Sequence, residues 1–111
     1  MVSEVVLVGG EGMGSPDAKL GRLLLGNFLR LLGDRESVPE YVVLWNGGVK
    51  TATADAETLG SLKRIEERGV KVVLCRTCVE YFGVADEIAV GEIDGMARIL
   101  EILSSHRVLT V

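Results

Sequence analysis

Short runs of consecutive apolar residues alternate along the chain with segments in which apolar residues recur every three or four positions. The runs are typical of strands buried on both faces of a parallel sheet, and the wider spacing is typical of amphipathic helices. The predicted strands are residues 5–8, 41–45, 70–74, 87–90 and 108–111. This alternation predicts an α/β fold: a three-layer α/β/α sandwich with a five-stranded, mainly parallel sheet, in a single domain over residues 1–111.

Helices are predicted between these strands. The first begins with Ser15 as N-cap and Pro16 at the first helical position, and it ends near Asp34. Its apolar residues are expected to face the core: Leu20, Leu23, Leu24, Phe28, Leu31 and Leu32. The remaining predicted helices are residues 56–68, residues 78–82 and a segment that starts at residue 94.

The turns that follow parallel strands meet at one edge of the sheet, because parallel crossovers are nearly always right-handed. The turns expected there are residues 9–15, 46–50, 75–78 and 91–95. Ligand crevices of open α/β sheets form at this carboxyl edge. We therefore predict that the functional site lies among these turns.

Length, composition and charge narrow the choice of function. The 111 residues are 48% apolar and 25% charged, which suits a globular domain with its own core. A formal net charge of -4, with scattered lysines and arginines, disfavours nucleic acid as a partner. Residues 1–4 carry no basic segment, and the apolar run 5–8 is too short for a signal peptide or a membrane span. We therefore expect a cytoplasmic protein with no membrane partner.

The only two cysteines, Cys75 and Cys78, follow a strongly apolar run and enclose Arg76 and Thr77. They are expected at the carboxyl edge of the sheet, where chemistry is favoured over packing. In a reducing compartment such a pair is more often catalytic or metal-binding than a structural disulfide. One Cys-x-x-Cys supplies only two of the four ligands of a zinc site, so no metal or cofactor is predicted unless an oligomer completes the site.

Thr77 is expected to be the N-cap of the short helix, with Glu80 completing a Thr-x-x-Glu capping box. Cys78 would then be the first helical residue. Free backbone amides, the helix dipole and the cation of Arg76 favour a thiolate there, whereas Glu80 opposes it. We expect the pKa of the Cys78 thiol to lie below that of a free cysteine, which would make this sulfur nucleophilic.

Other turn residues offer groups that bind anions. Asn46, Gly47 and Lys50 follow the second strand and are expected to face the cysteines with an amide and a cation. Gly12 belongs to a glycine-rich turn whose backbone amides suit a small anion. That turn lacks the nucleotide-binding patterns, because Ser15 occupies the third glycine position of the dinucleotide fingerprint. Both turns also have a plain structural explanation as tight connections.

The sequence offers two alternatives to a single nucleophilic cysteine. His106, the only histidine, opens the last strand and is expected at the opposite edge, too far from Cys78 for a cysteine–histidine pair. A thioredoxin-like redox pair stays open, because Cys-x-x-Cys beside a βαβ pattern is its usual cue, although here the motif follows the third predicted strand. A purely structural role for both cysteines also stays open.

Several motifs occur in a characteristic order along nearly the whole chain. They are Gly10-Glu11-Gly12, Leu20-Gly21, Phe28-Leu29, residues 43–50, residues 74–78, Tyr81-Phe82-Gly83 and residues 89–93. In this order they resemble the DsrE/F-like family. Within that family they are most similar to the carboxyl-terminal domain of YedF-type proteins, which are associated with sulfur relay and selenium metabolism.

This resemblance implies a sulfurtransferase-like domain in which one cysteine accepts sulfur as a persulfide and passes it to a partner protein. Cys78 matches the acceptor position, Cys75 matches a cysteine of the YedF-type subgroup, and Arg76 stands where that subgroup often has glycine. The family also implies a homo-oligomer, either a trimer or a hexamer. A TusA-like protein is among the implied sulfur donors and acceptors, because YedF-type proteins usually carry a TusA-like domain.

The sequence thus leads to three hypotheses. The leading one is a sulfur-relay protein that carries a persulfide on Cys78, with a link to selenium metabolism. The second is a thiol–disulfide redox protein or sensor that uses Cys75 and Cys78, and the third is a non-catalytic oligomeric binding module.

Overall fold

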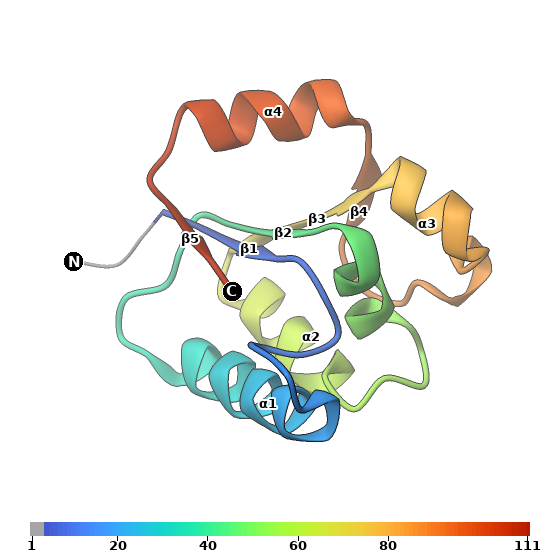
Figure 1. The fold of residues 1–111 in the computed structure, drawn as a ribbon. Helices are drawn as coiled ribbons and strands as arrows, with labels where there is room; N and C mark the ends of the chain where they lie inside the picture. Colours follow the sequence, from blue (N-terminus) through green and yellow to red (C-terminus); the bar gives the residue numbers. More distant parts are fainter. Residues whose placement is uncertain (1–3) are drawn as a thin grey trace.

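The computed structural model describes residues 4–111, and the predicted α/β fold is confirmed (Figure 1). The strands are β1 (Val5–Val8), β2 (Tyr41–Leu44), β3 (Lys71–Cys75), β4 (Glu92–Asp94) and β5 (Val108–Thr110). The helices are α1 (Ala18–Asp34), α2 (Leu59–Glu67), α3 (Arg76–Phe82) and α4 (Met96–Ser104), with the short 3-10 helices η1 (Asn46–Ala52) and η2 (Ala85–Glu87). These strands pair in parallel, in the order β4-β3-β2-β1-β5.

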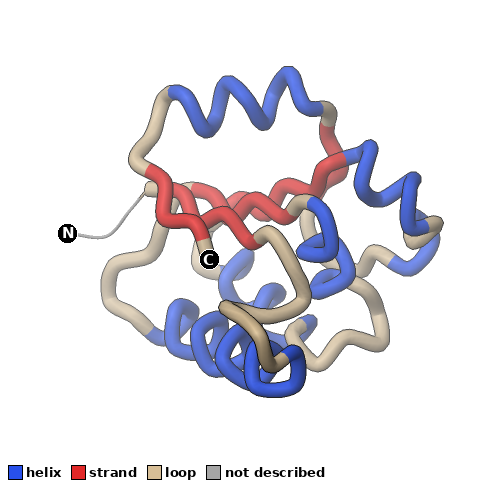
Figure 2. Tube along the Cα trace, in the orientation of Figure 1, coloured by secondary structure: helices blue, strands red, loops and turns tan. Residues whose placement is uncertain are grey.

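Helices cover both faces of the sheet. Figure 1 and Figure 2 show α1 and α2 against one face and α4 against the other. Strand side chains alternate between the two faces. Accordingly, Val6 and Val8 of β1 join the core beneath α1 and α2, whereas Val5 and Leu7 pack with Ile99 of α4. The three-layer sandwich is therefore confirmed.

α1 begins later than the sequence predicts. Its N-cap is Asp17, whose carboxylate accepts a hydrogen bond from the backbone amide of Leu20 at 2.9 Å. The prediction that Ser15 caps this helix and that Pro16 begins it is wrong. Serine and aspartate are about equally good N-caps, so the local pattern did not separate the two positions.

The prediction of a strand at residues 87–90 is also wrong. This segment instead contacts the chain that leaves η1, where the amide of Ala89 donates to the carbonyl of Ala52 at 2.9 Å. The edge strand of the sheet is β4, so Asp94 ends a strand and α4 begins at Met96. A short apolar run can satisfy its backbone in a loop as well as in a sheet, so the run alone does not locate a strand.

The face that α1 turns to the core differs from the predicted face. Leu25, Leu29 and Leu32 are buried. Four leucines that were expected to point inward are 44% to 62% exposed: Leu20, Leu23, Leu24 and Leu31. Leucines lie on more than one side of this helix, so their spacing did not single out the buried face. Among the helices of residues 4–111, none combines the length and the apolar character needed to cross a membrane.

Candidate functional site

The cysteines lie at the carboxyl edge of the sheet, as predicted. Cys75 ends β3 and is 1% exposed, whereas Cys78 lies in the first turn of α3 and is partly exposed. The backbone N–H of Asn46, at the start of η1 after β2, donates a hydrogen bond to Cys78 Sγ at 3.0 Å. The turns that follow two neighbouring strands therefore meet at one sulfur atom, and both cysteines are free thiols.

α3 begins directly at the end of β3, without an intervening turn. Its N-cap is Cys75, no side chain caps it, and Cys78 is the third helical residue. The predicted capping box of Thr77 and Glu80 is wrong, because Thr77 is already helical. Cys78 nevertheless lies within the first turn, where the helix dipole favours negative charge.

Burial raises the pKa of the Cys78 thiol above its ordinary value. The hydrogen bond from the Asn46 amide lowers this pKa, while the side chain of Cys75 raises it further. The Cys78 side chain packs against the cores on both sides of the sheet, which accounts for its loss of water. The predicted lowering of this pKa is therefore wrong. The resting group is a thiol, and the Asn46 amide stabilises the thiolate once the proton has left.

η1 fixes the position of the Asn46 amide. Asn46 has a φ of 52°, a left-handed conformation that asparagine tolerates better than most residues, and its side chain accepts a hydrogen bond from the Gly47 amide at 2.9 Å. At Gly48 a β-carbon would overlap the carbonyl oxygen of Val8 in β1. The close approach of η1 to β1 therefore requires glycine at position 48.

Arg76 and Gly12, two other predicted site residues, have neighbours of their own. Arg76 lies beside Gly95 at the end of β4, and a β-carbon on that glycine would be 3.3 Å from the Arg76 guanidinium. A β-carbon on Gly12 would be only 2.7 Å from the carbonyl carbon of Gly21, so the glycine-rich turn packs tightly on α1. Gly12 therefore has a packing role, and anion binding by either residue stays a prediction.

The amino edge of the sheet holds His106, as predicted. Its Nε2 lies 3.0 Å from a carboxylate oxygen of Glu40, which precedes β2 and so lies at the opposite end of that strand from the cysteines. Gly91 also lies at this edge, where its amide donates to Glu66 at 3.1 Å. The predicted turn at residues 91–95 therefore reaches the carboxyl edge only at its Gly95 end.

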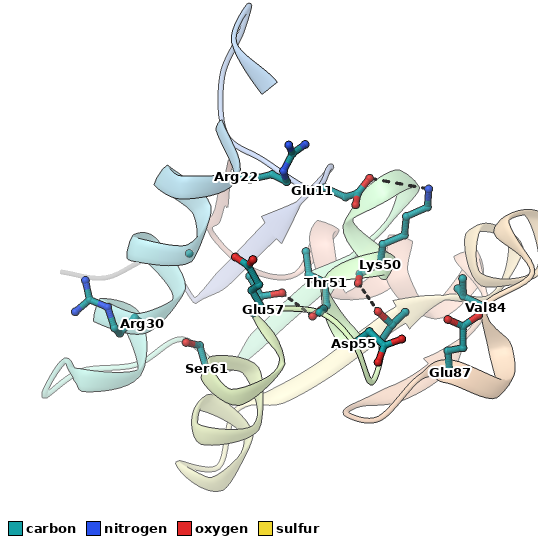
Figure 3. Close-up of a pocket in the computed structure, with 14 residues that line it drawn as sticks. Glu11, Arg22, Arg30, Lys50, Thr51, Asp55, Glu57, Ser61, Val84 and Glu87 are labelled. Carbon is teal, nitrogen blue, oxygen red and sulfur yellow. Dashed lines mark hydrogen bonds and ion pairs between the residues drawn. The ribbon is translucent and has the colours of Figure 1, made fainter. Parts of the chain in front are cut away.

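A groove of about 580 Å³ opens beside η1, and sequence reasoning missed it (Figure 3). It lies between α1, η1 and the start of α2. Its walls carry both signs of charge, from the basic residues Arg22, Arg30 and Lys50 and the acidic residues Glu11, Asp55, Glu57 and Glu87. The Lys50 ammonium lies 3.9 Å from the Glu11 carboxylate and 4.3 Å from the centre of the Phe82 ring in α3. Lys50 thus lines the groove and also contacts α3, the helix that carries Cys78. No local motif could have revealed the groove, because its residues come from separate segments of the chain.

Known proteins share this architecture. The family model for the DsrE/DsrF-like family matches residues 26–111. The solved structure of the ychN protein from E. coli is 21% identical, with a TM-score of 0.71 over 99% of this chain and 100% of that chain. The protein of unknown function MTH1491 from Methanobacterium thermoautotrophicum is 22% identical, with a TM-score of 0.69 over 96% of each chain. These identities show the fold alone, and a search of curated proteins finds no match.

Proposed function

The chain belongs to the DsrE/DsrF-like family, and on that premise we propose that it is a sulfur-relay protein that carries a persulfide on Cys78. The observation that carries the proposal is the hydrogen bond of 3.0 Å from the Asn46 backbone amide to Cys78 Sγ. An amide aimed at sulfur stabilises negative charge, which the sulfur bears both as a nucleophile and as a leaving group. Cys78 is also partly exposed, so the sulfur of a partner can reach it.

Loading moves one sulfur atom from a donor protein to Cys78. The Cys78 sulfur attacks the outer sulfur of a donor persulfide anion, the donor S–S bond breaks, and the proton of Cys78 ends on the departing donor sulfur as a thiol. The products are a Cys78 persulfide anion and a donor thiol. Because burial raises the pKa of Cys78, the resting thiol stays mostly protonated and reacts slowly with unselective oxidants.

Unloading runs through the same sulfur. An acceptor thiolate attacks the outer sulfur of the persulfide, the bond from that sulfur to Cys78 Sγ breaks, and Cys78 leaves as a thiolate facing the Asn46 amide. Cys75 is 1% exposed and is closed to a protein partner, so any part it takes is internal. In that internal reaction the Cys75 sulfur attacks Cys78 Sγ, hydrogen sulfide leaves, and a Cys75–Cys78 disulfide remains.

Intact-mass spectrometry after incubation with a persulfide donor tests the proposal. Wild type and Cys75→Ser are expected to gain one sulfur atom each, and Cys78→Ser none. Cys75→Ser is the matched control, because it removes the other thiol and keeps both Cys78 and the Asn46 amide. Equal labelling of all three proteins would refute the assignment to Cys78.

A thiol–disulfide redox protein is the second candidate. It is favoured by the closeness of the two cysteines, since the side chain of Cys75 raises the pKa of the Cys78 thiol. A reversible disulfide in the wild type, without any gain of sulfur from the persulfide donor, would support this function instead. A binding module, the third hypothesis, would leave Cys78 inert towards both the donor and alkylating reagents.

Partners, assembly and location are also proposals. We propose protein sulfur donors and acceptors, a TusA-like protein among them, and a homo-oligomer for which the exposed leucines of α1 offer an apolar surface. Sedimentation of the purified protein measures the assembly. The YedF-type link to selenium metabolism and the cytoplasmic location rest on the sequence motifs and composition alone. Loading Cys78 from a selenium donor, followed by intact-mass measurement, tests that link.

A further inference from the structure

Three potential metal ligands meet at the amino edge of the sheet, at the far end of the strands from the cysteines. Glu4 precedes β1, Glu40 precedes β2, and His106 lies between α4 and β5. One ligand atom from each residue lies within 4.8 Å of the other two. Within residues 4–111, no second group of three histidine, cysteine, aspartate or glutamate side chains converges in this way.

Backbone hydrogen bonds hold the three residues in place. The amide of Glu40 donates to the carbonyl of Glu4 at 2.7 Å, and the amide of Val5 donates to the carbonyl of Arg107 at 3.0 Å. β1 lies between β2 and β5 in the sheet, so Glu4 lies between the chain segments that carry the other two residues. Ligands anchored to strand ends in this way keep their geometry better than ligands on free loops.

The imidazole of His106 is oriented as a metal ligand. Nδ1–H donates to the carbonyl of Ile102 at 2.7 Å, which leaves Nε2 pointing at the carboxylate of Glu40 at 3.0 Å. Metal-binding histidines commonly donate their second N–H to a carbonyl, because this bond fixes the tautomer and the ring orientation. The Tyr41 ring packs edge-on against the imidazole, with the ring centroids 5.4 Å apart, and this contact further restricts rotation of the imidazole.

The contact between Nε2 and Glu40 requires a positive charge. A carboxylate offers only acceptors, and a neutral imidazole that donates through Nδ1 offers only a lone pair at Nε2. Two acceptors 3.0 Å apart repel each other unless a proton or a metal ion binds between them. A second carboxylate, that of Glu4, points into the same space, and two carboxylates with one neutral imidazole balance the charge of a divalent cation.

We propose that Glu4, Glu40 and His106 form a binding site for a divalent transition-metal ion, with zinc as the fitting example. An imidazole ligand favours zinc and its neighbours over magnesium or calcium, which prefer oxygen ligands alone. Zinc–ligand bonds of about 2.0–2.2 Å place the ligand atoms roughly 3.3 Å apart. The three ligand atoms lie within 4.8 Å of one another, so small side-chain movements are needed to close the site around an ion. Three protein ligands leave the fourth position to water or to a further ligand.

Such an ion joins β1, β2 and the α4–β5 connection at the edge opposite Cys78. A ligand that binds only the folded state raises the free energy of unfolding of the protein. Once the ligand concentration exceeds the dissociation constant, the gain grows with the logarithm of that concentration. Zinc is therefore expected to raise the thermal midpoint of the chelator-treated protein in a concentration-dependent manner. This inference does not depend on the proposed sulfur relay.

The test uses Cys78→Ser protein that has been freed of metal with a chelator, so that the cysteine pair cannot bind the added ion. Zinc is titrated by calorimetry and by thermal unfolding, and cobalt serves as a spectroscopic probe. We expect binding of one ion, with affinity reduced at least about tenfold in Glu40→Gln and in His106→Asn. His106→Asn keeps a side-chain N–H for the Ile102 carbonyl while it removes the Nε2 ligand. Glu101 is an exposed residue on α4, and Glu101→Gln in the same Cys78→Ser background is the control. This control should bind zinc with the same affinity as Cys78→Ser alone.

Each outcome supports or overturns the site. Cobalt spectra without a thiolate band, together with loss of binding in both ligand variants, support it. Zinc affinity that survives in Glu40→Gln and His106→Asn overturns it. A third outcome also overturns it: Glu40→Gln lowers the thermal midpoint without metal, and zinc has no effect on any variant. In that case a proton on Nε2 forms an ion pair with Glu40, and no metal binds.

Discussion

Gly48→Ala is expected to destabilise the fold and to disturb the sulfur site together. A β-carbon at this position would overlap the carbonyl oxygen of Val8 and lie 3.0 Å from the carbonyl carbon of the same residue. Both obstacles are backbone atoms that cannot rotate away, so η1 must move off β1. Overpacking of this kind costs about 1–3 kcal/mol. For a domain of this size that corresponds to a fall in the thermal midpoint of about 4 °C for each kcal/mol.

The same movement reaches the sulfur, because Asn46 lies two residues before Gly48 on η1. The hydrogen bond from the Asn46 amide to Cys78 Sγ is 3.0 Å long, and a displacement of about 1 Å weakens it severely. This bond lowers the pKa of Cys78 against the effect of burial. Its loss should therefore move the pH dependence of Cys78 alkylation to higher pH.

Thermal and urea unfolding measure the first effect, and timed alkylation with iodoacetamide across neutral and alkaline pH measures the second. Gly60→Ala is the matched control, because a β-carbon on Gly60 in α2 meets nothing within 4 Å. Alanine is the better helix former, so this variant should gain about 0.5–1 kcal/mol without any change in Cys78 alkylation. The reasoning fails if Gly48→Ala keeps both the stability and the alkylation profile of the wild type.

In the wild type, alkylation of Cys78 should reach half its maximal rate at a higher pH than a free cysteine in a peptide, because burial raises its pKa. Ile99→Ala should lower the free energy of unfolding, measured by urea denaturation, by about 2–5 kcal/mol, because Ile99 is fully buried between α4 and the sheet. Leu100→Ala, at a position 62% exposed, should change it by no more than about 0.5 kcal/mol. The Gly95 amide lowers the pKa of Asp94. The stability that Asp94 contributes is therefore present above its unfolded-state pKa and lost as pH falls through the folded-state pKa, so the thermal midpoint of Asp94→Asn should fall less in acid than that of the wild type.

The layers and the edge that carries the site could be predicted from the sequence, because they depend on patterns that recur locally. β1 was located to the residue, since all its side chains are buried and its apolar run is unbroken. Asn46 and the two cysteines were placed at the same edge by the handedness of parallel crossovers alone. The hydrogen bond between Asn46 and Cys78 confirms that placement.

The details that decide reactivity could not be predicted, because they depend on packing between distant segments. The amide of Asn46 and the sulfur of Cys78 are 32 positions apart in the sequence. The sign of the Cys78 pKa shift depends on how closely both cores surround its side chain, which no local pattern records. The capping box at Thr77 failed for a related reason, since the sequence does not show that β3 continues into α3 without a turn.

The anchoring of the sulfur site to β2 and β3 has a consequence for partner choice. Both strands are inner strands of the sheet, so the separation of amide and sulfur is set before any partner arrives. In the proposed sulfur relay, transfer would then need no rearrangement of this protein, and its rate would depend on how well a partner surface fits around Cys78. Under that proposal, discrimination between partners would fall to exposed neighbours such as Arg76, Thr77 and Tyr81, the last of which is 83% exposed. Those positions can change from one protein to the next while the chemistry at the sulfur stays the same.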